Sequence, residues 1–208
     1  MDNPAFMQMM DDIFGTVPSR NIFRLEPKRI AALKSRIASW DGLVRVFIHP
    51  MYEMWRGNGG SFRIERGLSR LVRMPPAMVP PIIIFEEQEY ATQLSLWLKY
   101  ENQDTGLNCY TVETEPDDPT PFGYEKEYRA YGWGAVSDKF KKLGIRRILM
   151  GGVRLEIVGE PDWTGKSPFM CQCVGIALSH LSNRKAGAFE VELSALMDPP
   201  DARRHFAL

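Results

Sequence analysis

Residues 142–196 run from KLGIRRILMGG (142–152), through a polar loop, to AFEVELSAL (188–196). Ile148–Met150 is a short apolar run that Gly151-Gly152 ends, which predicts a buried strand stopped by a glycine pair. Ser167-Pro168 is a typical helix start, and Phe189–Leu193 alternates as a half-buried strand does. The stretch therefore predicts strand, loop, helix and strand, in that order.

The chain before this stretch repeats the same arrangement. Helical spacing of apolar residues and strand-like apolar runs predict the following elements: helices from Pro27, over Gln88–Tyr100 and over Tyr124–Leu143; strands Leu43–Ile48, Ile82–Phe85 and Asn108–Glu113. Strands separated by helices indicate crossover connections and a mainly parallel sheet. We expect an α/β three-layer sandwich of about five strands with helices on both faces, forming one domain over residues 22–208 after an N-terminal segment, 1–21.

Composition narrows the classes of protein. The 208 residues hold 26 Lys plus Arg and 26 Asp plus Glu, so no net charge attracts nucleic acid, which is not expected as a partner. No apolar run approaches the ~20 residues of a membrane span. Three cysteines do not make a secreted disulfide framework. We expect a cytoplasmic protein without membrane contact. The sequence does not indicate a particular cofactor, and it is compatible with a monomer or a homo-oligomer.

In open α/β sheets, ligands bind beyond the carboxyl ends of the strands. This rule selects His49 after the first strand, Glu113 after the third, and Gly151, Gly152 and Arg154 after the fourth. Histidine as a residue type titrates near neutral pH, so a histidine in a crevice, such as His49, would serve as a general acid or base. The alternative is a structural histidine that shapes the turn before Pro50. Glu113 is the second candidate for a catalytic role.

Glu86 and Glu87 also follow a predicted strand, the second. Adjacent residues on an extended chain point to opposite faces, so at most one of them would reach a shared pocket. The favoured interpretation is that they complement the dipole of a helix that begins there.

Lys166 and Ser167 lie at the predicted helix start after the fourth strand. The unpaired backbone N–H groups of a helix N-terminus suit an anion, and Lys166 adds positive charge. The spacing does not match a nucleotide-hydrolysing P-loop, because position 160 is Glu where that motif needs its first Gly. We therefore expect Gly151, Gly152, Arg154, Lys166 and Ser167 to contact a small polar or anionic ligand.

Cys173 is a candidate nucleophile, since the start of a helix favours the reactive thiolate. Cys173-Val174-Gly175-Ile176-Ala177 resembles the nucleophile segment of isochorismatase-like cysteine hydrolases, in which a Cys-Val pair follows the fourth strand of a parallel three-layer fold. That resemblance implies a catalytic cysteine here. The sequence departs from the family, however, because His49 occupies the region of the family's first-strand Asp. A buried structural cysteine is the alternative.

No metal site is expected. Cys171, Cys173 and His180 share the predicted helix, but Cys173 and His180 lie two turns apart, about 10 Å along the axis. Ligands of one zinc ion must all lie within about 2.0–2.3 Å of it, so these side chains cannot share an ion.

Two functional hypotheses follow. The first is an enzyme, a hydrolase or transferase, that acts on a small polar or anionic molecule at the strand ends. The second is a non-enzymatic binding protein that docks a partner through a basic helix or a Met-rich N-terminus. The basic helix carries an arginine stripe of Arg63, Arg66, Arg70 and Arg73, and the N-terminus contains Met7, Met9 and Met10.

Overall fold

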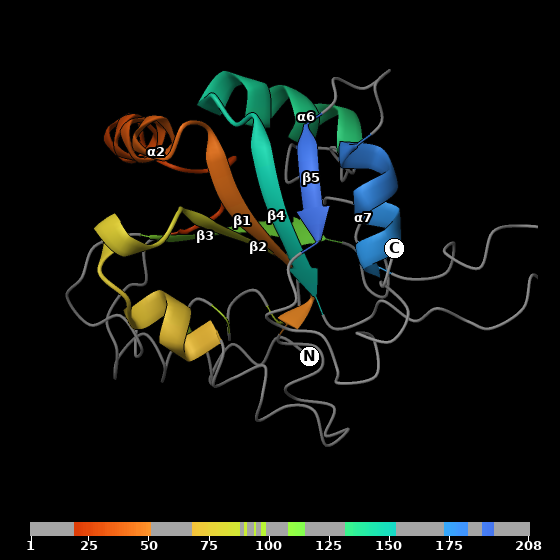
Figure 1. Ribbon diagram of the computed structural model, residues 1–208, viewed down its shortest axis with the longest axis horizontal. Helices are drawn as coiled ribbons and strands as arrows, with labels where there is room; N and C mark the ends of the chain where they lie inside the picture. The colour runs from red at the N-terminus through yellow and green to blue at the C-terminus, as the bar shows by residue number, and fades with distance from the viewer. Residues whose placement is uncertain are drawn as a thin grey trace, which may run out of the picture.

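A computed structural model describes residues 19–50, 68–87, 108–114, 132–152, 173–182 and 189–193, together with residues 90, 94, 97 and 98. These residues contain one five-stranded sheet with the order β3-β2-β1-β4-β5 (Figure 1). All four strand pairings are parallel. The strands are β1 (Leu43–Ile48), β2 (Ile82–Glu87), β3 (Cys109–Thr114), β4 (Arg147–Gly152) and β5 (Glu190–Leu193). The prediction of an α/β fold with a parallel sheet of five strands is confirmed.

The central strands are apolar because both of their faces are covered. All six residues of β2 are buried, and in β1 only Leu43 and Arg45 are partly exposed. A strand covered on both faces has a nearly continuous apolar run instead of an alternating pattern. This is why the run Leu43–Ile48 in the sequence marked β1 with the bounds that the structure has.

Three helices pack against one face of the sheet. They are α2 (Pro27–Ser39), α6 (Gly132–Leu143) and α7 (Cys173–Leu181). Pro27 occupies the first turn of α2, where a missing N–H costs no hydrogen bond. Figure 1 shows α6 next to both α2 and α7, and contacts join α6 to each. Buried residues of these helices form one core with the strand residues that alternate toward them: Val44, Val46, Ile48, Ile83, Phe85, Tyr110 and Val112.

Helical residues also cover the opposite face. The helical residues 68–73 and the helical positions 90, 94, 97 and 98 lie on this side of the sheet, with a short 3-10 helix, η1 (Pro76–Met78), nearby. The second core contains Leu68, Leu71, Val72, Leu94, Leu98, Phe47, Ile82, Ile84 and Cys109. Successive side chains of one strand thus point into different cores, one on each face of the sheet, as the alternation of a pleated strand requires.

The outer edge of β3 is covered by the segment before α2. Ile22 N–H donates to Thr111 O, and Thr111 N–H donates to Arg20 O, each at 2.9 Å. Asn21 forms a parallel bridge with Thr111. The boundary that the sequence suggested at residue 21 therefore falls inside a pairing that protects the edge strand from other chains.

Two predicted strand ends are corrected. Gly151 and Gly152 do not follow β4 but belong to it, paired with Phe47 and Ile48 of β1. Likewise, β2 continues through Glu86 and Glu87, which pair with Glu113 and Thr114. In each case a neighbouring strand supplies ladder hydrogen bonds that extend the strand past the residues whose local preferences would end it.

Candidate functional site at the carboxyl edge of the sheet

The chain reverses its direction of travel across the sheet between β1 and β4. From β1 it proceeds outward to β2 and β3, and it then returns to place β4 and β5 on the other side of β1. Ile48 pairs with Gly152, so β1 and β4 end at the same level. His49 and Gly151 therefore lie at one edge, as the sequence predicted. This reversal is where ligands of open parallel sheets bind.

His49 is held tightly at this edge. It is 4% exposed, and its backbone N–H donates to Phe85 O at 2.8 Å. Its φ of 52° lies in the left-handed region, which His adopts more readily than most residues. The ring atom Nε2 lies 2.8 Å from Thr114 Oγ1, a hydrogen bond whose donor depends on the tautomer. The backbone of His49 is thus held by β2 and its ring by Thr114 of β3, and these two hydrogen bonds favour one orientation of the imidazole.

Thr114 is the partner that the sequence did not reveal. It is fully buried, with 0% exposure, and it ends β3, one residue beyond the predicted strand. Between β1 and β3 lies β2, so the hydrogen bond to His49 spans the ends of three strands. The sequence did hold a signal for Thr114, namely its position at the end of a strand. If the predicted strand had been one residue longer, the rule that ligands bind at carboxyl ends of strands would have selected it.

Glu113 precedes Thr114 on β3, and the two side chains point to opposite faces of the sheet, because successive side chains of a strand alternate. Its side chain is 12% exposed, and Oε1 lies 3.9 Å from Arg24 Nη1. Its other oxygen, Oε2, is buried and accepts no hydrogen bond from the described residues. The carboxylate thus contacts Arg24, and the hydroxyl of the next residue contacts His49.

Glu86 and Glu87 are buried at the end of β2, with exposures of 0% and 2%. The backbone N–H of Glu87 donates to Glu86 Oε1 at 3.2 Å. The side chains of Glu86 and Glu87 point to opposite faces of the sheet. Glu87 pairs with Thr114 in the ladder between β2 and β3, so these two side chains point to the same face. Burying a carboxyl group is costly unless it is compensated, so two such groups at one strand end mark a polar region inside the protein.

The start of α7 lies beside the ends of β1 and β4. A Cβ atom built on Gly152 would come within 2.4 Å of Val174 Cγ2 and 3.0 Å of Ile48 O. Glycine at residue 152 is thus required for α7 to approach. Cys173, the first residue of α7, is placed at this edge by its backbone. The Cys173 side chain, like Arg154, Lys166 and Ser167, lies outside the described residues.

A cavity of about 370 Å³ lies elsewhere, against β4 and β5. Its lining contains Leu43, Arg147, Leu149, Glu190 and Glu192, and no residue predicted for the site. In the part of the chain that the structure describes, no three His, Cys, Asp or Glu side chains are placed to hold a metal ion. No helix within that part has the length and apolar character that a membrane crossing requires.

Comparison with protein-family models, with curated proteins and with solved structures gives no match to this chain. The assignment of a function therefore depends on the geometry of the carboxyl edge. That edge combines the imidazole of His49, the hydroxyl of Thr114 hydrogen-bonded to it, and the buried carboxyl group of Glu87, which leaves the same face of the sheet as Thr114. Such a set can give a proton to a bound molecule, or take one from it, away from bulk water.

Proposed function

We propose that the carboxyl edge of the sheet, where β1 and β4 meet, binds a small polar or anionic molecule. The single observation that carries this proposal is the position of His49: at the reversal point, 4% exposed, and hydrogen-bonded to Thr114 at 2.8 Å. His49 is thus held at the edge where open parallel sheets bind ligands, and an imidazole fixed at such an edge can act as a general acid or base.

In this proposal His49 exchanges a proton with the ligand during hydrolysis or group transfer. Thr114 is a positioning residue, because it acts through the ring of His49. The N-terminus of α7 faces the same edge, as the close approach of Val174 to Gly152 supports. The N–H groups of a helix N-terminus would complement an anionic group of the ligand, and Cys173 would then stand where a nucleophile is needed.

The test is a thermal-shift screen of nucleotides, sugar phosphates and carboxylates on the wild-type chain and on His49→Asn. Asparagine tolerates the left-handed backbone of residue 49, so this variant removes the imidazole with little added strain. We expect one ligand class to raise the melting temperature of the wild type and to lose that effect in His49→Asn. A ligand that stabilises both proteins equally, or a screen with no stabilising ligand, contradicts the proposal.

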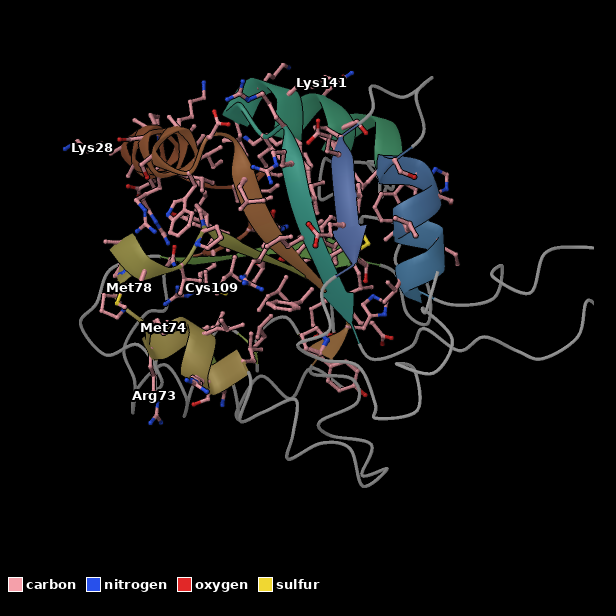
Figure 2. All side chains as sticks on the ribbon, viewed as in Figure 1. Lys28, Arg73, Met74, Met78, Cys109 and Lys141 are labelled. Carbon is pink, nitrogen blue, oxygen red and sulfur yellow. The ribbon has the colours of Figure 1, made fainter. Side chains whose placement is uncertain are left out.

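A second candidate is an interaction protein that uses its basic helix. The observation in its favour is that Arg70 and Arg73 are exposed, and Figure 2 shows Arg73 pointing away from the sheet. Met78, which is 62% exposed, lies close by in the chain. Arg63 and Arg66 lie outside the described residues. Charge reversal of Arg70 and Arg73 should abolish binding of an acidic polypeptide such as polyglutamate. The control variant His49→Asn should leave that binding unchanged. If the charge-reversed variant still binds polyglutamate as the wild type does, this function is excluded.

A further inference from the structure

We propose that Arg29 and Arg20, at the junction of α2 with the outer edge of β3, bind a phosphate group. Arg20 reaches the carbonyl of Cys109, the first residue of β3, so this site lies toward the amino edge of the sheet. His49 and Thr114 lie at the carboxyl edge. The phosphate site is therefore independent of the function proposed above.

The first observation is a pair of unused donors on Arg29. Its Nη1 donates to Ser19 O at 2.7 Å. Its Nε and Nη2 are out of contact with solvent and have no hydrogen-bond partner among the described residues. These two nitrogens share one edge of the guanidinium, so their N–H bonds are parallel and match two oxygens of a single oxyanion. Buried donors are nearly always hydrogen-bonded, so this edge calls for an acceptor from outside the described residues, such as an anion or a water molecule.

The second observation is the charge around this pair. Arg20 is 9% exposed, and Nη1 donates to Cys109 O at 3.2 Å. Burial lowers the pKa of Arg20, and the neighbouring charge of Arg29 lowers it further, against the opposing effect of Cys109. Among the described residues, neither Arg20 nor Arg29 forms a salt bridge with a carboxylate, whereas Arg24, Arg146 and Arg147 each do. Two adjacent cations in partly desolvated positions without a counterion are unfavourable, so an anion would stabilise them.

Arg36 shows the contrast within the same helix. Its Nη2 contacts Pro76 O, donates to Val79 O at 3.2 Å, and donates to Asn108 Oδ1 at 2.9 Å. This nitrogen joins α2 to the segments before β2 and β3, and its acceptors are neutral groups of the protein. Nη2 of Arg36 thus has protein acceptors, whereas Nε and Nη2 of Arg29 have none among the described residues.

A phosphate fits this arrangement better than a singly charged group. It carries nearly two negative charges at neutral pH, which balances both guanidinium groups. Tyr110, 2% exposed, lies within reach of the same charges: burial raises the pKa of its hydroxyl, and the charges of Arg29, Arg36 and Arg20 oppose that rise. Arg29 is only partly buried as a residue, so its guanidinium lies close to the surface from which a phosphate would approach.

The experiment is isothermal titration calorimetry on the full chain with inorganic phosphate, glucose 6-phosphate and citrate at low ionic strength. We expect both phosphates to bind, and Arg29→Gln to weaken them at least about tenfold, as loss of a charge-assisted pair of hydrogen bonds predicts. Absence of phosphate binding to the wild type, or unchanged binding in Arg29→Gln, overturns the proposal. Tighter binding of citrate would make this a carboxylate site and overturn the phosphate assignment.

Three variants make the result specific. Lys28→Gln removes an exposed charge that points outward from α2 in Figure 2, and it should change the affinity less than about twofold, since solvent screens such a charge. Arg29→Lys keeps the charge but loses the parallel N–H pair, so it should also bind weakly. If Arg29→Lys binds phosphate as tightly as the wild type, the contact is not bidentate. If circular dichroism shows that Arg29→Gln does not fold, Arg29→Lys replaces it as the test. His49→Asn should retain full affinity; a loss there would assign the phosphate to the carboxyl edge instead.

Discussion

Gly152 and Val174 lie so close together that residue 152 has no room for a side chain: a Cβ atom there would be 2.4 Å from Val174 Cγ2. It would also lie 3.0 Å from the backbone oxygen of Ile48, an atom that the sheet holds in place. The glycine at the end of β4 therefore sets how closely the first turn of α7 packs on the sheet. This contact brings the N-terminus of α7 to the edge where His49 lies.

Replacing Gly152 by alanine should destabilise the protein. The added methyl group must displace α7 or bend β4, which costs about 1–3 kcal/mol for an overpacked core position. The measurement is the free energy of unfolding in urea. Gly134→Ala is the matched control, because a Cβ atom at this exposed position of α6 meets nothing within 4 Å. That control should gain up to about 1 kcal/mol from helix propensity, and equal stability of the two variants would show that the contact at Gly152 is not tight.

Thr114→Val should reduce both stability and the proposed function. It keeps the shape of the side chain but removes the oxygen that contacts His49 Nε2, leaving a buried ring nitrogen without this partner at a cost of about 1–3 kcal/mol. Thr114→Ser retains the hydroxyl and should keep the ring in place. Two-dimensional NMR of the His49 ring nitrogens, through their tautomer-dependent shifts, measures the effect. An identical ring spectrum in Thr114→Val would mean that Thr114 does not orient His49.

The cysteines should differ in reactivity toward iodoacetamide. Cys109 is fully buried, and desolvation raises the pKa of its thiol to about 12, against the opposing effect of Arg20. Its thiolate fraction at pH 8 is then roughly one in ten thousand, so the folded protein should remain unlabelled at this residue. If Cys173 is the nucleophile of the proposed function, it should react well below pH 8. Mass spectrometry of the labelled peptides separates the two, and unfolding in urea should expose Cys109; labelling of Cys109 before unfolding contradicts its burial.

The same thiol should make stability fall in alkaline solution. The pKa of Cys109 is raised from its ordinary value of 9.0 to about 12 in the folded protein. Between these values the folded state keeps the proton that the unfolded chain releases, so the free energy of unfolding decreases as pH rises above about 9. Cys109→Val removes this contribution. Urea unfolding from pH 8 to pH 11 should show the wild type losing stability relative to the variant, and parallel curves would contradict the shift.

Much of the fold could be predicted from local pattern. The spacing of Leu33 and Ile37 marked α2, and the apolar run Leu43–Ile48 marked β1, because burial selects apolar residues with the period of each element. The alternation of strands and helices then indicated parallel pairing. It followed that His49 and Gly151 would share one edge, and the register of β1 with β4 confirms this.

The candidate site was predicted only in part. Sequence reasoning selected His49, with Glu113 as a second catalytic candidate, but it did not select Thr114, the residue that forms the hydrogen bond to His49 from 65 residues away in the chain. Neither the unused donors of Arg29 nor the packing role of Gly152 has a local signal. Each depends on which atoms of distant segments come within a few ångströms, and hydrophobic periodicity carries no information on that.

The sequence by itself determined that five strands alternate with helices in a parallel sheet, and at which edge of that sheet His49 lies, because those follow from burial and from chain direction. Only the tertiary structure decided that Thr114 forms a hydrogen bond with His49, that α7 begins beside β4, and that Arg29 and Arg20 lie together at the edge of β3 with no counterion among the described residues. The physical reason is range: propensity and periodicity act over a few residues, while hydrogen bonds and charges act between any atoms that folding brings together.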